Sequence, residues 1–452
     1  MSDLALLEAM EAVESAWLAA LVGTGVAPAS ARHPISGLVG PDDLDALARD
    51  AESGGNPVIG LVRLLRHRLG STDSARWLHR GLTSQDVMDT ALVLCLRDAL
   101  DETSRQLDAQ VRTLAALAET HRDTVMVGRT LTQHAVPMTF GLKAATWLTG
   151  VLDCRELIAS VRPRLAAQLG GAVGTMAAAT ELARLRGADD GPGAAWELVS
   201  ATAATLGLPA RLPWHTTRAP LTAVGDALVS CTDAWGHLAA DVATLSRPEI
   251  AELAEGRGGG SSTMPGKRNP TLSVLIRRAA LAGPPLASTL HLAAATTVDE
   301  RPDGAWHAEW AALRDLGRRT VVAGSQTTDL LAELRVDPAR MRATLESAGG
   351  AAAEQQSMAE LVDGTPSDSY LGAARLITNA ALHRARAPRP SSTTQPSDTA
   401  PPSDTARPSD AARPRDTARP SDAARPSDAA RPSDAARPSD TARPESAPQE
   451  KR

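Results

Sequence analysis

Aromatic residues are scarce in this 452-residue sequence, which has one phenylalanine and one tyrosine against eight tryptophans. A core built with so few of them must consist mainly of alanine, leucine and valine. Alanine and leucine are strong helix formers, and small side chains let neighbouring helices approach closely. Alternation typical of strands is also rare, so the sequence predicts an all-α protein.

Cysteine, excess positive charge and long apolar runs are lacking too. The cysteines Cys95, Cys154 and Cys231 lie far apart and are odd in number, which excludes a disulfide framework or a zinc-ligand spacing built from them. The net charge of −6 gives no reason to expect nucleic acid or an anionic membrane as a partner. No apolar run is long enough to span a membrane, and the N-terminus lacks the basic start and apolar block of a signal peptide. We therefore expect a cytoplasmic protein with reduced thiols.

Apolar stripes with helical spacing run through most of the chain. In residues 84–122, positions such as Leu96, Leu100 and Leu107 form one stripe, which predicts a helix of roughly 35 residues. Further helices are expected over about 137–169, 219–245, 270–292 and 306–334. Helices with single apolar stripes must bury them on one another, so we expect a long bundle.

The C-terminal segment differs in composition from the rest. From Pro396 to Arg443 a six-residue unit close to PSDAAR occurs eight times. Proline at every sixth position prevents a continuous helix, and without large apolar residues the segment cannot offset its ordering entropy. We expect 387–452 to be a disordered tail without an essential role in catalysis. Before it we expect an N-terminal helical domain (1–82), a central bundle (83–335) and a reduced C-terminal helical domain (336–386).

The first of three polar segments is LHRGLTSQDVMDT, residues 78–90, at the start of the longest predicted helix. Thr83 and Asp86 fit a capping box, and one interpretation is that they only cap the helix. The other is that Thr83, Ser84 and the free N–H groups of the first turn hold a carboxylate, because helix N-termini favour anions. His79, one turn earlier, would then add a donor or a proton.

The second polar segment is VGRTLTQHAVPMTFGLK, residues 127–143. Polar side chains gather there just before an apolar helix, and such groups need either solvent or a ligand. The residues of this cluster are Arg129, Thr130, Thr132, Gln133 and His134.

The third polar segment is GRGGGSSTMPGKRNP, residues 256–270. Its glycines let the backbone move, while Asn269 is a suitable N-cap and Pro270 a suitable first residue for the next helix. The segment is either a flexible surface loop or a lid that brings its own acid–base group, with Ser261 and Lys267 six residues apart.

Together the three segments resemble the fumarase/aspartase superfamily. GGSSTMPGKRNP is similar to its signature loop, GLTSQDVMDTAL to its T-S-x-D region, and GRTLTQHAVPMTFGLKAATWL to its second region; the resemblance extends over 1–386. Within the superfamily, QLGGAVGTMAA (168–178) and ERPDGAWHAEW (300–310) are most similar to the bacterial 3-carboxy-cis,cis-muconate cycloisomerases. Like them, the chain lacks the catalytic histidine that fumarases and adenylosuccinate lyases carry where Leu131 stands. Gly266, and the short region after Ala351, depart from the cycloisomerase pattern.

The resemblance implies an all-helical homotetramer whose active sites each collect the three segments from three different subunits. It implies a small tricarboxylate substrate, no cofactor and no metal, in agreement with the absence of a dinucleotide fingerprint or metal-ligand cluster from the sequence. The implied reaction converts 3-carboxy-cis,cis-muconate to 4-carboxymuconolactone, a step of protocatechuate breakdown, through an aci-carboxylate.

The resemblance also implies roles for particular residues. Ser261 would carry the proton and Lys267 would activate it. The expected substrate-binding residues are His79, Thr83, Ser84, Thr130, Gln133, Asn269, Arg301 and His307. Two alternatives stay open: an adenylosuccinate-type lyase that eliminates fumarate, and an inactive scaffold with the same fold.

Overall fold

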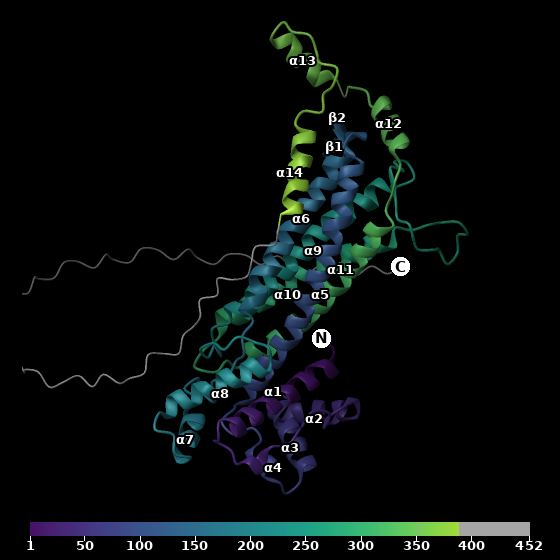
Figure 1. Cartoon of the computed structure of the whole chain (residues 1–452). Helices are drawn as coiled ribbons and strands as arrows, with labels where there is room; N and C mark the ends of the chain where they lie inside the picture. Colours follow the sequence, from purple (N-terminus) through teal and green to yellow (C-terminus); the bar gives the residue numbers. More distant parts are fainter. Residues whose placement is uncertain (351, 388–452) are drawn as a thin grey trace, which may run out of the picture. The chain divides into compact units, whose positions relative to one another are not determined.

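Helices dominate the computed structural model, which describes residues 1–350 and 352–387 (Figure 1). The predicted all-α fold class is confirmed. The predicted disordered tail lies outside the described residues, apart from Ala387. Among the described residues, no helix has both the length and the apolarity that crossing a membrane requires.

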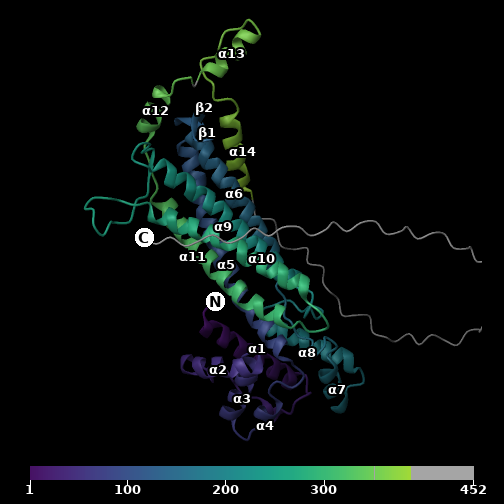
Figure 2. The ribbon, with the colours of Figure 1, turned by 180° about the vertical axis from the view of Figure 1, so that it is seen from behind.

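Five long helices pack side by side as a bundle (Figures 1 and 2). They are α5 (Ser84–Thr120), α6 (Phe140–Val161), α9 (Ala219–Leu245), α10 (Thr271–Thr296) and α11 (Gly304–Ala332). Small residues allow a close approach between α9 and α10. A Cβ at Gly225 would lie 2.8 Å from Leu290 Cδ1, and one at Gly236 would lie 2.5 Å from Ala280 Cβ. The expectation of a close-packed helical core, made from the sequence's small side chains, therefore agrees with the structure.

One predicted helix has different ends. The helix expected over 137–169 begins at Phe140 and ends at Val161. It ends early because the short 3₁₀ turn Arg162–Arg164 contains Pro163, whose ring does not fit a helix interior. It begins late because Thr139 is its N-cap, with Oγ1 accepting a hydrogen bond from the Leu142 N–H at 3.1 Å.

A β-hairpin precedes α6 where the sequence suggested only a polar loop. Strand β1 (Val125–Thr130) pairs antiparallel with β2 (Gln133–Thr139), with Thr130 opposite Gln133. The two turn residues, Leu131 and Thr132, both have positive φ values, 47° and 70°. Two-residue turns with this backbone match the twist of hairpin strands. The second polar segment is therefore a β-hairpin joined directly to a bundle helix.

The N-terminal part contains four helices, and α1 packs against the bundle helix α5 and against α8. Their bounds are α1 (Asp3–Gly23), α2 (Leu44–Gly54), α3 (Val58–Leu69) and α4 (Asp73–Trp77). Two more helices, α7 (Ala177–Leu185) and α8 (Gly191–Thr205), lie between α6 and α9 in the sequence.

The C-terminal part of the described chain has three short helices. They are α12 (Pro338–Ser347), α13 (Ala353–Leu361) and α14 (Ala374–Arg386), preceded by the two-residue strand pair β3 (Leu253–Ala254) and β4 (Arg335–Val336). Helix α14 packs along α6 and α5, and Arg384 on it is ion-paired with Asp153 and Glu156 of α6. The domain limits at 82, 335 and 386 stay predictions.

Candidate active site

A cleft of about 390 Å³ opens beside the start of α5. It is lined by Val58, Ile59, Val62, Arg63, Arg66, His79 and Ser84. Two predicted binding residues, His79 and Ser84, thus share one cavity with two arginines and an apolar wall. The arginines come from α3, to which the sequence analysis assigned no role.

Thr83 and Arg301 meet at the same end of α5. Arg301 Nη1 donates a hydrogen bond to Thr83 Oγ1 at 2.9 Å, and its guanidinium lies 5.6 Å from the centre of the Trp306 ring. The structure therefore brings together two residues that were selected from segments far apart in the chain. His307 lies nearby, with its ring 5.1 Å from that of Trp306, although it is exposed and its Nδ1 is bonded to Asp303 O.

His79 is held by a carboxylate that the sequence analysis did not identify. Its backbone φ is +64°, and its Nδ1 lies 2.5 Å from Oε1 of Glu14 on α1. Glu14 is fully buried, and its second oxygen has no hydrogen-bond partner among the described residues. The pair fixes the imidazole ring at the edge of the cleft.

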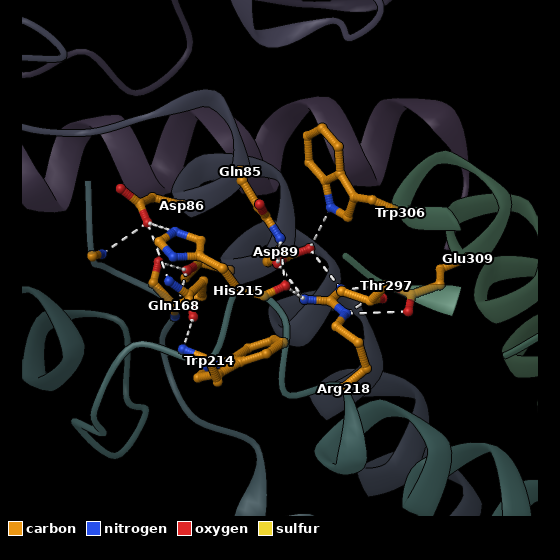
Figure 3. Close-up of polar contacts among 12 residues, drawn as sticks. Gln85, Asp86, Asp89, Gln168, Trp214, His215, Arg218, Thr297, Trp306 and Glu309 are labelled. Atoms are coloured by element: carbon orange, nitrogen blue, oxygen red, sulfur yellow. Dashed lines mark hydrogen bonds and ion pairs between the residues drawn. The ribbon is translucent and has the colours of Figure 1, made fainter. Parts of the chain in front are cut away.

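Asp86 joins the start of α5 to the glycine-containing loop of residues 168–176 (Figure 3). Its carboxylate accepts hydrogen bonds from the backbone N–H groups of Thr83 at 2.9 Å, Gly170 at 2.8 Å and Gly171 at 2.9 Å. The buried His215 adds a contact from Nε2 at 3.0 Å. The predicted capping box is present, and the same aspartate also fixes the loop beside Thr83.

A buried ionic network connects α5 with α11 (Figure 3). Arg218 is ion-paired with Asp89 at 2.7 Å and with Glu309 at 2.6 Å, and Trp306 Nε1 donates to Asp89 at 2.9 Å. Burial opposes the charge of Arg218, but the two carboxylates raise its pKa, so it stays cationic. Burial raises the pKa of Glu309, against the opposing effect of Arg218. The network fixes the first turns of α11, and with them Trp306, against the start of α5.

The third polar segment stands out from the bundle between α9 and α10 (Figure 1). Its base is closed by backbone hydrogen bonds between Gly259 and Asn269, 2.8 and 2.7 Å long. Ser261 Oγ accepts hydrogen bonds from the N–H groups of Met264 at 3.1 Å and Thr263 at 3.4 Å. Ser261 and Lys267 both lie in this loop, where Ser261 is half-buried and Lys267 is exposed.

The start of α10 differs from the prediction. Asn269 is not its N-cap, because its side-chain Nδ2 donates to Gly260 O within the loop, and the helix begins at Thr271 after Pro270. The free N–H groups of Leu272 and Ser273 are bonded to the carboxylate of Glu255 instead, at 3.1 and 2.7 Å. Since this helix start already holds an anion of the protein itself, it does not add to the stabilisation of a substrate carboxylate.

The hairpin residues lie elsewhere. Thr130 and Gln133 pair beside the turn, and the turn residue Leu131 is 95% exposed. Arg129, the residue before Thr130, is ion-paired with the buried Glu252 at 2.7 Å. The hairpin follows the C-terminal end of α5, whereas Thr83 precedes its start.

That arrangement separates the first two polar segments within one chain. Helix α5 has 37 residues, so its two ends are about 55 Å apart at 1.5 Å per residue. A small substrate cannot contact residues at both ends. Thr130 and Gln133 act on the same molecule as Thr83 only if they belong to another copy of the chain.

The comparison with known proteins begins with a family model. The model of the lyase family matches residues 52–282. The chain belongs to this family. The predicted resemblance to the fumarase/aspartase superfamily is confirmed. Within the described residues, no group of three or more His, Cys, Asp or Glu side chains is arranged to hold a metal ion.

Two of its relatives have different activities in their names. A nitrosuccinate lyase of Streptomyces davaonensis is 43% identical over 389 residues, 84% of this chain and 80% of the relative. A 3-carboxy-cis,cis-muconate cycloisomerase of Bradyrhizobium diazoefficiens is 40% identical over 356 residues, 77% and 76% of the two chains. Among solved structures, the 3-carboxy-cis,cis-muconate lactonizing enzyme of Pseudomonas putida has a TM-score of 0.74 at 32% identity, over 85% of this chain and 95% of that one. The chain is therefore a lyase-family enzyme of the lyase or cycloisomerase type, and its exact substrate is a separate question.

Proposed function

We propose that this enzyme makes or breaks a bond β to a carboxylate, with Ser261 moving the proton. The observation that carries the proposal is the pair of backbone N–H groups bonded to Ser261 Oγ. Hydrogen bonds donated to an oxygen favour its negatively charged form. They help a serine, a weak base by itself, to act as one.

We propose nitrosuccinate as the substrate, supported by the relative with 43% identity over 84% of the chain. Ser261 would remove a proton from the carbon next to one carboxylate, and the electron pair of that C–H bond would move into the carboxyl group. The resulting aci-carboxylate would return the electrons to form a C=C bond, while the C–N bond breaks and nitrite leaves. The products are fumarate, nitrite and a proton.

The second candidate is the cycloisomerisation of 3-carboxy-cis,cis-muconate, supported by the relative at 40% identity and by the likeness to the lactonizing enzyme. In that reaction a carboxylate oxygen adds to a C=C bond of the same molecule, and Ser261 delivers a proton to the adjacent carbon. Both reactions pass through an aci-carboxylate. The two substrates also have a similar outline, three planar and electronegative groups on a short carbon chain.

In either reaction, the loop and the cleft have separate tasks. Lys267 and Asn269, on the same loop as Ser261, supply a cation and a donor to the aci-carboxylate, and such preorganised donors contribute strongly to rate. His79, Thr83, Ser84 and Arg301 hold the remaining anionic groups, with His307 at the margin. Thr130 and Gln133 contribute from the hairpin of a further copy, which makes the proposed enzyme a homotetramer with shared sites. A cytoplasmic location also stays a proposal, since it rests on the sequence alone.

The test is a parallel assay of the purified full chain with nitrosuccinate, 3-carboxy-cis,cis-muconate and adenylosuccinate. We expect nitrite and fumarate to appear in equal amounts from the first. Loss of diene absorbance from the second compound, without nitrite release from the first, would identify a cycloisomerase. Turnover of adenylosuccinate alone would support the third reaction, and turnover of none would point to an inactive scaffold.

A further inference from the structure

The cleft beside His79 contains a cation without a carboxylate bonded to it. Arg66 Nη2 donates to the Leu78 carbonyl at 2.8 Å, while its buried Nε–H has no hydrogen-bond partner among the described residues. The other two arginines of α3 are paired, Arg68 with Asp43 at 2.6 Å and Arg63 with Asp50 at 3.2 Å. A buried donor without a partner is costly, so an arginine in this state indicates a missing acceptor.

The charges around Arg66 favour an anion from outside the protein. Burial lowers the pKa of Arg66, the neighbouring Arg80 lowers it further, and only Glu14 opposes these two effects. Glu14 itself is bonded to His79. A bound carboxylate would relieve the repulsion between the two arginines and supply the missing acceptor.

The position of Arg66 defines which part of a ligand it would bind. Arg66, His79 and Ser84 line the same cleft, and Ser84 follows Thr83, which is bonded to Arg301. Two groups that can bind an anion, the Arg66 guanidinium on α3 and the first turn of α5 at Ser84, therefore line one cleft. The cleft volume of about 390 Å³ is at the lower end of the range for ligand pockets, about 300–1,000 Å³, which favours a small acid.

We infer that Arg66 binds the second anionic group of a small dianionic ligand whose first carboxylate is held at Thr83, Ser84 and Arg301. Arg66 is then a specificity-determining residue that selects dicarboxylates over monocarboxylates. The inference uses the proposed function for the location of the substrate site, but its test does not depend on turnover.

The test uses two unreactive four-carbon acids, succinate and butyrate, with the full-length protein in isothermal titration calorimetry. We expect the wild type to bind succinate more tightly than butyrate. Arg66→Gln should weaken succinate binding about tenfold or more, as expected for the loss of a hydrogen bond between charged groups, and should leave butyrate binding unchanged. Arg76→Gln is the matched control, because Arg76 is 80% exposed, pairs with Asp73 and lies outside the cleft.

A second variant guards against misfolding. Because Arg66 also holds the Leu78 carbonyl, Arg66→Lys is measured beside Arg66→Gln, with the thermal midpoint of each. Lysine keeps the positive charge but lacks the branched N–H donors of the guanidinium. We therefore expect an intermediate preference for succinate over butyrate, with a thermal unfolding midpoint near that of the wild type. The inference is wrong if the wild type does not distinguish the two acids, or if both folded Arg66 variants keep the wild-type preference. Absence of turnover in all three assays would not contradict this inference. Unchanged succinate binding in the Arg66 variants would in turn not contradict the proposed function.

Discussion

Ser261 differs from its neighbour Ser262 in its surroundings. The Ser261 oxygen is bonded to two backbone N–H groups of the loop, whereas no hydrogen bond of the Ser262 side chain is recorded in the described part of the chain. This asymmetry agrees with the role predicted for the first serine from the family's loop pattern.

Replacing Ser261 by alanine should therefore lower kcat by about 10²–10⁴-fold, the usual contribution of a general acid–base group. KM should change little, because in the proposed mechanism the anionic groups of the substrate are bound by residues of the cleft and not by Ser261. Ser262→Ala is the control and should have a milder effect. Steady-state kinetics of both variants decide the point, and a Ser261→Ala enzyme within about threefold of wild-type kcat would move the search for the base to His79, His134 or His307.

The sequence indicated some site residues and hid others. Thr83 and Arg301 were selected by motif, and their hydrogen bond shows that the motif points to one place. Glu14 and Arg66 lie on helices whose apolar pattern gives no sign of a polar role. Their importance comes from tertiary contacts: Glu14 is bonded to His79, and Arg66 lines the cleft. A single sequence does not contain that information.

At the scale of elements, the start of α10 shows how a local rule can be overridden. Asparagine followed by proline is a good start signal, yet Glu255, sixteen residues before Thr271, satisfies the helix N–H groups. The carboxylate is buried and also accepts a hydrogen bond from Ser273 Oγ at 2.6 Å. It ties the base of the 256–270 loop to the helix that follows.

Glu255→Ala should lower the free energy of unfolding by about 1–2 kcal/mol, the typical effect of losing a helix cap. Denaturant titration measures the change. Glu346→Ala, at an exposed position of α12, is the control and should lie within about 0.5 kcal/mol of the wild type. An unchanged midpoint in the Glu255 variant would show that water replaces the carboxylate without cost.

The hairpin was missed for a comparable reason. Its turn residues, Leu131 and Thr132, are not the asparagine, aspartate or glycine that usually indicate a two-residue turn with positive φ. Pro137 in β2 also argues against a strand when the sequence is considered alone. The pairing with β1 outweighs both signals.

The buried network between α5 and α11 should make stability depend on pH. Burial raises the pKa of Glu309 above its usual value of 4.5, so the folded state binds this proton more tightly than the unfolded state. The resulting stabilisation of the folded state is complete at pH values below 4.5, and it is lost as the pH rises through the raised pKa of Glu309. Glutamine does not ionise, so Glu309→Gln should remove this pH-dependent loss of stability. We expect the unfolding free energy of the variant to change less with pH than that of the wild type. Denaturant titrations from pH 4 to pH 8, roughly the window in which a raised carboxyl pKa acts, compare the two proteins, and parallel curves would contradict the assignment.

At the scale of the whole molecule, the five bundle helices could be predicted because their apolar stripes are long and regular. The last described helix, α14, is fixed to the bundle by Arg384 and by packing on α6 and α5. The chain beyond it has the repeat composition described above.

Ending the chain after Ala387 should therefore leave kcat, KM and the oligomeric state unchanged. The reason is composition: the removed repeats lack the large apolar residues needed to pack on the enzyme. Size-exclusion chromatography with light scattering, together with the substrate assay, tests this. A truncated enzyme that dissociates or loses activity would show that the repeats form a functional contact.

The length of the bundle helices has a consequence for mixtures of two inactive variants. If each site combines the cleft of one copy with the loop of another, two differently damaged versions of the chain can repair each other. Refolding Ser261→Ala together with Arg301→Gln should restore activity that neither protein has alone, since some sites in the mixed oligomers receive an intact loop and an intact cleft. Mixing each variant only with itself is the control. Activity that never exceeds that of the separate variants would mean that every site is built from one chain. That is geometrically difficult, because the 26 residues of α10 lie between the loop and Arg301, a length of about 39 Å at 1.5 Å per residue.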